Sequence, residues 1–205
     1  MAKYHPREVA VELSADLTLN LLELRPVSRH RYWARVWPSS VALGQWLMRR
    51  GRAERGVGAK ELGCGLGLVS ATLSHLGFDT EGTDISRDAL CLSARNGDRN
   101  RIAEYALTEL DWAAPQGATS SLIVGSDIVY DPLAPGRLFD LIELHAMLEP
   151  GGKFVVSGPK LRSDLLGDLR VMFRDRGYSE STEAQSVDWE GEEHAIEIIE
   201  LVRPR

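Results

Sequence analysis

The sequence is poor in cysteine, and its histidines are not clustered, which excludes several classes of protein. Among its 205 residues only Cys64 and Cys91 are cysteines, and they form no CxxC pair. We therefore expect neither a disulfide framework nor a zinc cluster. The five histidines are scattered, and none lies within a few positions of another, so we expect no metal site.

Long apolar runs are missing as well. No stretch approaches the roughly 18 consecutive apolar residues that a membrane span needs, and the first residues lack the pattern of a signal peptide. We therefore expect no membrane partner and a cytoplasmic location. The chain carries 24 basic and 30 acidic residues, and its net charge of -6 argues against broad electrostatic binding to nucleic acid.

The composition that remains fits a globular chain with a sizeable core, because 43% of the residues are apolar and 26% are charged. Residues 8–25 alternate polar and apolar side chains and predict one or two short strands, with a turn at residues 14–16. Ser39 or Ser40 is expected to cap a helix that runs to about Arg50.

From residue 57 onward, predicted strands and helices alternate. Strands are expected at 57–62, 78–84, 104–108, 121–126, 153–157 and 195–202, and helices at 67–76, 87–100, 138–148 and 164–176. Strands separated by helices of this length form parallel βαβ units with right-handed crossovers. The sequence thus predicts a doubly wound α/β domain with a mostly parallel sheet over residues 51–205. Residues 1–50 are predicted to form a short β/α extension that covers the site.

A glycine-rich segment connects the first of these strands to the first helix. Residues 61–67 read ELGCGLG, and glycine allows positive φ and a close approach of the backbone to a ligand. The N-terminus of the following helix offers unpaired N–H groups to an anionic group. Asp84 ends the next strand, 21 positions after Gly63, where a carboxylate can accept both ribose hydroxyls of an adenosine.

Two classes of cofactor compete for this segment. The dinucleotide fingerprint is GxGxxG, but Leu68 stands where its third glycine belongs. The GxGxG spacing preceded by Glu61 suits S-adenosylmethionine, which has no pyrophosphate to hold. A simple tight turn between strand and helix is the remaining alternative. A P-loop is excluded because no GK[ST] follows.

Five segments in this order resemble the class I S-adenosylmethionine-dependent methyltransferases. More narrowly, they are similar to the seven-β-strand protein-lysine methyltransferases, whose bacterial members are often labelled nicotinamide N-methyltransferase-like. The segments are Val36–Ser40, Glu61–Gly67, Thr83–Ile85, Leu110–Trp112 and Gly125–Tyr130. The resemblance implies a seven-stranded, Rossmann-like methyltransferase fold. One departure is Lys60, which stands in a strand position where the family usually has an apolar residue.

The resemblance also implies roles for individual residues. The residues implied to bind the cofactor are Trp37, Glu61, Gly63, Cys64, Gly65, Gly67, Asp84, Ile85, Asp111, Trp112 and Ser126. Asp127 and Tyr130 are implied to face the entering acceptor and to act in catalysis, with Trp33 and Trp37 helping to form its channel.

Simpler interpretations stay open for several of these residues. Trp37 and Trp112 could be packing residues, Asp111 could cap a turn, and Tyr130 could be a packed turn aromatic. The basic cluster over residues 29–35 is expected to be a solvated face, or else a site that recognises a carboxylate.

The function implied is S-adenosylmethionine-dependent N-methylation of a lysine side chain on a protein partner, with S-adenosylhomocysteine as the product. A small-molecule N- or O-methyltransferase is the alternative. A cofactor-binding module without catalysis is the third hypothesis, which the complete set of motifs argues against.

Overall fold

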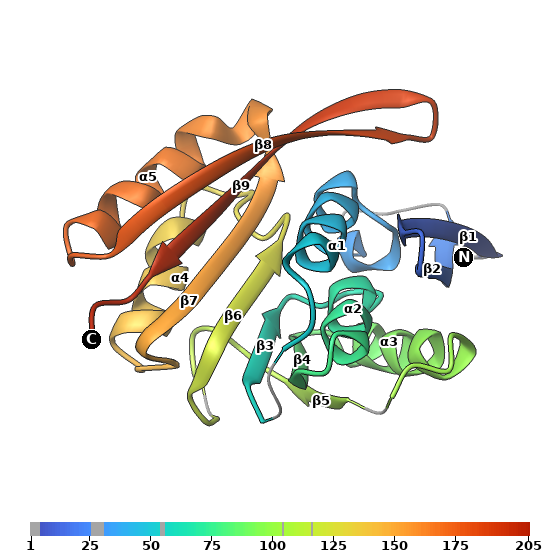
Figure 1. Cartoon of the computed structure of the whole chain (residues 1–205), viewed down its shortest axis with the longest axis horizontal. Helices are drawn as coiled ribbons and strands as arrows, with labels where there is room; N and C mark the ends of the chain where they lie inside the picture. The colour runs from blue at the N-terminus through green and yellow to red at the C-terminus, as the bar shows by residue number, and fades with distance from the viewer. Residues whose placement is uncertain (1–4, 26–30, 54–55, 104, 116) are drawn as a thin grey trace.

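The computed structural model describes residues 5–25, 31–53, 56–103, 105–115 and 117–205, and its centre is a seven-stranded sheet (Figure 1). The strand order is β5-β4-β3-β6-β7-β9-β8. The first five of these strands run parallel, whereas β9 is antiparallel to both of its neighbours. Helices pack on both faces of the sheet, so the predicted doubly wound, mostly parallel α/β fold is confirmed.

The elements of the sheet and its helices follow in chain order. They are β3 (Gly58–Leu62), α2 (Leu68–His75), β4 (Asp79–Asp84), α3 (Arg87–Arg99), β5 (Ala106–Glu109), β6 (Ser120–Ser126), α4 (Ala134–Glu143), β7 (Leu148–Pro159), η2 (Lys160–Arg162), α5 (Ser163–Arg174), β8 (Ser179–Trp189) and β9 (Glu192–Val202). They are preceded by β1 (His5–Ser14), β2 (Leu17–Arg25), η1 (Tyr32–Ala34) and α1 (Pro38–Arg50). No helix within the described ranges is both long enough and apolar enough to cross a membrane.

Two apolar cores lie on opposite faces of the sheet because successive strand residues point to opposite sides. Val155 of β7 belongs to the core shared with α1, α2 and the β1–β2 hairpin. Its neighbours Phe154 and Val156 belong to the core shared with α4 and α5. Strands buried on both faces are apolar throughout, which is why β6 and β7 could be predicted from their sequence.

The N-terminal strands form an antiparallel hairpin, as predicted, and its turn is closed by a hydrogen bond from the Asp16 N–H to Ser14 Oγ (3.1 Å). The hairpin packs against α1 and α3. The β8–β9 hairpin reaches past α1 towards it (Figure 1), and Glu190 at its tip forms ion pairs with Arg7, Arg25 and Arg35. The division of the chain at residue 51 stays a prediction.

Several predicted boundaries were wrong. The helix expected at 138–148 is α4, which starts earlier, at Ala134, with Pro135 in its first turn, where its missing N–H costs nothing. Leu148 already pairs with β6, and the turn expected at 150–152 is an irregularity within β7, where the ladder to β6 resumes at Lys153. Neither Ser39 nor Ser40 caps α1, since Pro38 is its first residue.

The strand missing from the prediction is β8. It is an edge strand whose side chains are mostly exposed, so its sequence shows no apolar alternation. The strand expected at 104–108 is β5, which begins at Ala106 and ends at Glu109, and Glu104 lies outside the described residues.

Lys60 keeps its place in β3 through polar contacts. Its side chain is only 1% exposed, yet Nζ lies 2.9 Å from Glu81 Oε2 on β4 and donates a 3.1 Å hydrogen bond to the Ala118 carbonyl. The charge is therefore paired, as burial of an ammonium requires.

Candidate active site

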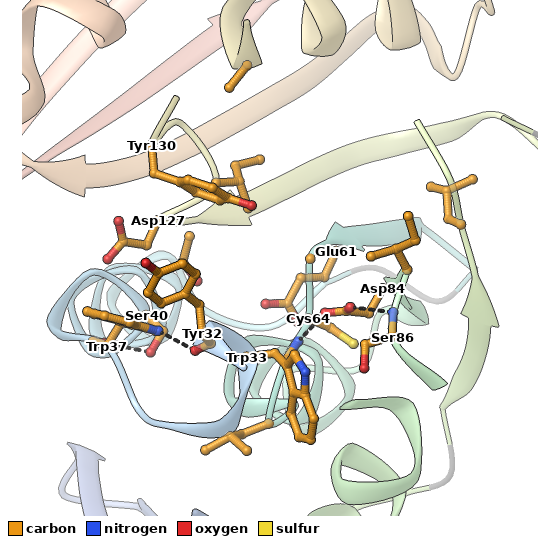
Figure 2. Close-up of a pocket in the computed structure, with 18 of the residues that line it drawn as sticks. Tyr32, Trp33, Trp37, Ser40, Glu61, Cys64, Asp84, Ser86, Asp127 and Tyr130 are labelled. Carbon is orange, nitrogen blue, oxygen red and sulfur yellow. Dashed lines mark hydrogen bonds between the residues drawn. The ribbon is translucent and has the colours of Figure 1, made fainter. Parts of the chain in front are cut away.

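A cavity of about 550 Å³ opens at the carboxyl ends of the parallel strands, between β3, β4 and β6 and the segment that leads into α1. Ligands of doubly wound sheets bind at this edge. All the predicted site residues line it except Gly67. Figure 2 shows Glu61 and Asp84 on one side, and Trp37, Asp127 and Tyr130 on the other.

The glycine loop has the backbone that its sequence predicts. Gly65 has a φ of +52°, and a Cβ there would lie 3.1 Å from the Trp33 carbonyl oxygen. Gly67 has a φ of +81°, and a Cβ there would lie 2.2 Å from Ser93 Oγ on α3. Gly67 therefore allows two helices to pack closely, while Gly65 brings the backbone to the cavity wall.

Asp84 ends β4 with its carboxylate held by the backbone. Its Oδ2 accepts a hydrogen bond from the Gly65 N–H (3.0 Å), and its Oδ1 accepts one from the Ser86 N–H (2.8 Å). Burial raises the pKa of Asp84, and these backbone hydrogen bonds oppose the rise. Since a carboxylate can accept about four hydrogen bonds, each oxygen keeps capacity for a ligand.

Glu61 lies in the floor of the cavity and is 1% exposed. Its Oε2 accepts hydrogen bonds from both the N–H and the hydroxyl of Ser70 on α2. Burial raises the pKa of Glu61 to about 8, although the Ser70 bonds favour the charged form. Burial likewise raises the pKa of the neighbouring Cys64 thiol well above its usual range.

Asp111 and Trp112 line the cavity beside β4. Asp111 Oδ1 accepts a 2.9 Å hydrogen bond from the Ala113 N–H, so it does cap the turn that was the simpler interpretation. Trp112 packs against the core beneath α4 with part of its side chain, and the rest faces the cavity. The turn thus fixes a carboxylate and an indole at one wall.

Three aromatic rings gather at the opposite side (Figure 2). The Tyr32 ring centroid lies 6.3 Å from that of Trp37 and 6.2 Å from that of Tyr130. Trp37 Nε1 donates a 2.8 Å hydrogen bond to the Tyr32 carbonyl, and the Arg35 guanidinium lies 4.6 Å over the Trp37 ring. Tyr32 and Tyr130 are 47% and 55% exposed, so this aromatic cluster is open to solvent.

Asp127 follows β6 with a φ of +56°, a strained conformation for a residue other than glycine. Its N–H donates a 2.8 Å hydrogen bond to the Ser157 carbonyl at the end of β7. Its carboxylate forms an ion pair with Arg162. Burial raises the pKa of Asp127, and Arg162 opposes that rise.

Sequence reasoning missed some contributors to the site. Arg162 lies 35 positions from Asp127, and no local signal links the two residues. Tyr32 belongs to the aromatic-basic stretch before α1, which could have identified it. In the basic cluster, Arg29 lies outside the described residues, and Arg35 is partly buried between Trp37 and Glu190, unlike a residue of a solvated face.

Within the described part of the chain, no group of three or more His, Cys, Asp or Glu side chains is placed to hold a metal ion. No protein-family model and no curated protein matches the sequence.

Solved structures match the chain in three dimensions. An S-adenosylmethionine-dependent methyltransferase of Agrobacterium tumefaciens has a TM-score of 0.67 and 14% identity, covering 100% of this chain and 71% of that one. Magnesium protoporphyrin IX methyltransferase of Synechocystis, with S-adenosylmethionine bound, has a TM-score of 0.63 and 19% identity. The match covers 80% of this chain and 77% of that one.

Ribosomal protein L11 methylase of Lactobacillus delbrueckii has a TM-score of 0.58 and 20% identity. The match covers 81% of this chain and 79% of that one. The chain therefore has the Rossmann-like fold of class I S-adenosylmethionine-dependent methyltransferases.

Proposed function

We propose that the protein is an S-adenosylmethionine-dependent methyltransferase that methylates a lysine side chain of a partner protein. The observation that carries the proposal is the layout of one cavity. A glycine loop with two buried carboxylates forms one side, and an acidic residue with three aromatic rings forms the other. Cofactor and acceptor can then meet between the two sides.

The residues of the first side fit this cofactor chemically. When bound, S-adenosylmethionine would supply a methyl group on a positively charged sulfur, which a neutral amine can attack while the sulfur leaves as the thioether of S-adenosylhomocysteine. The unfilled acceptor capacity of Asp84 suits the two ribose hydroxyls. The buried Asp84 carboxylate favours a cationic ligand over a phosphorylated one, because a buried negative charge would repel a pyrophosphate. Asp111 and Trp112 suit the adenine. Asp111 can accept a hydrogen bond from the adenine amine, and the Trp112 indole offers the ring a flat apolar surface.

The second side suits a lysine. A lysine must lose its proton before it can attack, and with an ordinary pKa of about 10.4 this costs about 4–5 kcal/mol near pH 7. Entry among the Tyr32, Trp37 and Tyr130 rings removes water from the ammonium and lowers its pKa. Asp127 can accept an N–H of the amine and orient it, and holding the amine and the methyl group in line as a whole can remove about 7–11 kcal/mol of the barrier.

The exposure of Tyr32 and Tyr130 supports a protein acceptor. Because the aromatic cluster opens to solvent, a lysine on a folded surface can reach it without the partner entering the cavity. The second candidate is methylation of a small molecule. It is favoured by the likeness to the magnesium protoporphyrin IX methyltransferase, whose name specifies a small-molecule substrate.

One experiment separates the two candidates. The protein is incubated with methyl-labelled S-adenosylmethionine and a cell lysate, and the protein and small-molecule fractions are counted separately. We expect label in a protein band, on lysine after hydrolysis. Label in a small molecule other than S-adenosylmethionine itself, with none in protein, would support the second candidate. If no label is transferred and no S-adenosylhomocysteine forms, the third hypothesis, a binding module without catalysis, is supported.

The Asp127→Ala variant tests the acceptor side. It should lower the rate of label transfer much more than it weakens cofactor binding measured by calorimetry. Loss of cofactor binding with full turnover at saturating cofactor would show that Asp127 belongs to the cofactor side instead.

A further inference from the structure

The ion pair between Asp127 and Arg162 joins two loops at the carboxyl edge of the sheet. Asp127 follows β6, and Arg162 ends the short η2 turn after the neighbouring strand β7. The Asp127 main chain is tied to the same strand, since its N–H donates to the Ser157 carbonyl. Both the backbone and the side chain of Asp127 are therefore fixed from β7.

This fixation matters because the backbone conformation of Asp127 is strained. A left-handed conformation persists at a residue other than glycine only when its surroundings enforce it. Arg162 takes up one carboxylate oxygen, and because each oxygen can accept two hydrogen bonds, the second keeps capacity to accept an N–H beside the Ser39 hydroxyl. The ion pair thus selects which oxygen of Asp127 meets an acceptor in the cavity.

Two charged groups and one hydroxyl face Asp127, each from a different part of the fold. Arg162 faces it from η2, Arg35 from the segment before α1, and the Ser39 hydroxyl from the first turn of α1. All three groups favour the ionised carboxylate. Of the two arginines, Arg35 is also bound to Glu190, whereas Arg162 has Asp127 as its ion-pair partner among the described residues.

The pairing has a consequence for the acceptor. A lone buried carboxylate stabilises an ammonium and so hinders the loss of its proton. A carboxylate already neutralised by a guanidinium keeps its hydrogen-bond acceptor oxygen and stabilises the ammonium much less. The pair can therefore orient an amine without holding it in the unreactive charged form.

We propose that Arg162 is a positioning residue, which keeps Asp127 ionised and oriented so that the pair, and not Asp127 alone, receives the acceptor as a neutral amine. The role of Arg162 rests on the proposed function, because Arg162 would act on the acceptor only through Asp127.

The test compares Arg162→Met with Arg162→Lys, and with Arg170→Met as a matched control. Arg170 lies on α5 and is 34% exposed against 32% for Arg162, but it pairs with Glu180 and Glu197, which do not line the cavity, whereas Asp127 does. All variants are first checked by thermal unfolding, and Arg162→Gln replaces Arg162→Met if the latter does not fold.

The first readout needs no turnover. The Asp127 carboxyl is followed by carbon NMR against pH in protein labelled at aspartate, with the Asp127→Asn variant used for assignment. An opposite charge in contact lowers a carboxyl pKa by about 1–3 pH units. Arg162→Met should therefore raise the Asp127 titration midpoint by about 1 pH unit or more, Arg162→Lys should partly restore it, and Arg170→Met should leave it in place.

The second readout is the pH dependence of label transfer to the lysate protein fraction at saturating S-adenosylmethionine. Its acid limb should move upward with the NMR midpoint, while cofactor affinity by calorimetry stays within about twofold. An unchanged midpoint in Arg162→Met overturns the inference, as does a shifted midpoint with an unmoved acid limb. If the unaltered protein labels no protein fraction at all, the proposed function fails, and the NMR titration still decides whether Arg162 sets the charge of Asp127.

Discussion

The buried carboxyl of Glu61 makes stability depend on pH in a direction opposite to that of most acidic side chains. Its pKa rises from an ordinary value of 4.5 to about 8 because the side chain is removed from water. Below pH 4.5 the group is protonated in the folded and unfolded states alike, so it costs nothing. As the pH rises towards 8, only the unfolded state releases the proton, and folding becomes less favourable.

The size of this effect follows from linkage. At about 1.36 kcal/mol per pH unit, the difference between the two pKa values corresponds to about 5 kcal/mol of unfolding free energy, lost between pH 4.5 and pH 8. A loss of this size is a large share of the stability of an ordinary domain. Glu61→Gln removes it, because an amide carries no proton to lose and still offers an oxygen to Ser70.

The assay is chemical denaturation of both proteins without cofactor at several pH values from 5 to 8.5. We expect Glu61→Gln to gain several kcal/mol over the unaltered protein across this range, while the exposed control Glu12→Gln on β1 follows the unaltered protein. Other titrating groups are common to both proteins and cancel in the difference. Parallel stability curves for Glu61→Gln and the unaltered protein would refute the reasoning.

Three further predictions concern Asp84, which is proposed to bind the ribose, the glycine loop and the buried lysine. Asp84→Ala should weaken S-adenosylmethionine binding by at least about 100-fold in calorimetry, because charged hydrogen bonds contribute about 1.5–3 kcal/mol each; unchanged affinity would exclude the proposed role. Gly67→Ala should destabilise the protein by about 2–5 kcal/mol, from its left-handed φ and its clash with α3. Gly77→Ala, which has positive φ but open space around it, should cost only about 1–2 kcal/mol in the same unfolding assay, and equal losses would contradict the clash. Glu81→Leu should lower the free energy of unfolding by about 3–5 kcal/mol, because it leaves the buried ammonium of Lys60 without its ion-pair partner. The control Glu109→Leu, which breaks the exposed pair with Arg87, should lower it by less than about 1 kcal/mol.

Local sequence was enough to predict the parts of the site in which neighbouring residues cooperate. The ELGCGLG segment predicted the positive φ of its glycines, and the strand pattern placed Asp84 at the end of β4, because backbone sterics and strand ends decide both. Residues 121–126 of β6 and 153–157 of β7 were predictable from burial, because strands covered on both faces favour apolar side chains, whereas the first part of β7 was taken for a helix end and a turn.

Long-range contacts escaped prediction. The Asp127–Arg162 pair depends on how two loops meet at the edge of the sheet, which no sequence spacing encodes. Strand β8 was missed because an exposed edge strand needs no apolar face. The helix expected at 138–148 was predicted to end too late. Its apolar pattern continues into Met147 and Leu148, but these residues are buried because Met147 leads into β7 and Leu148 begins it.

The contact between Glu190 and the arginines of the N-terminal hairpin bears on how the protein is made. Arg35, which stacks on Trp37, is held by Glu190, a residue that is synthesised 155 positions later. During translation, the glycine loop and Asp84 are available long before the β8–β9 tip has left the ribosome. Trp37 thus gains this support only after the β8–β9 tip has been made, so in a nascent chain the Trp37 side of the cavity should become ordered later than the glycine loop and Asp84.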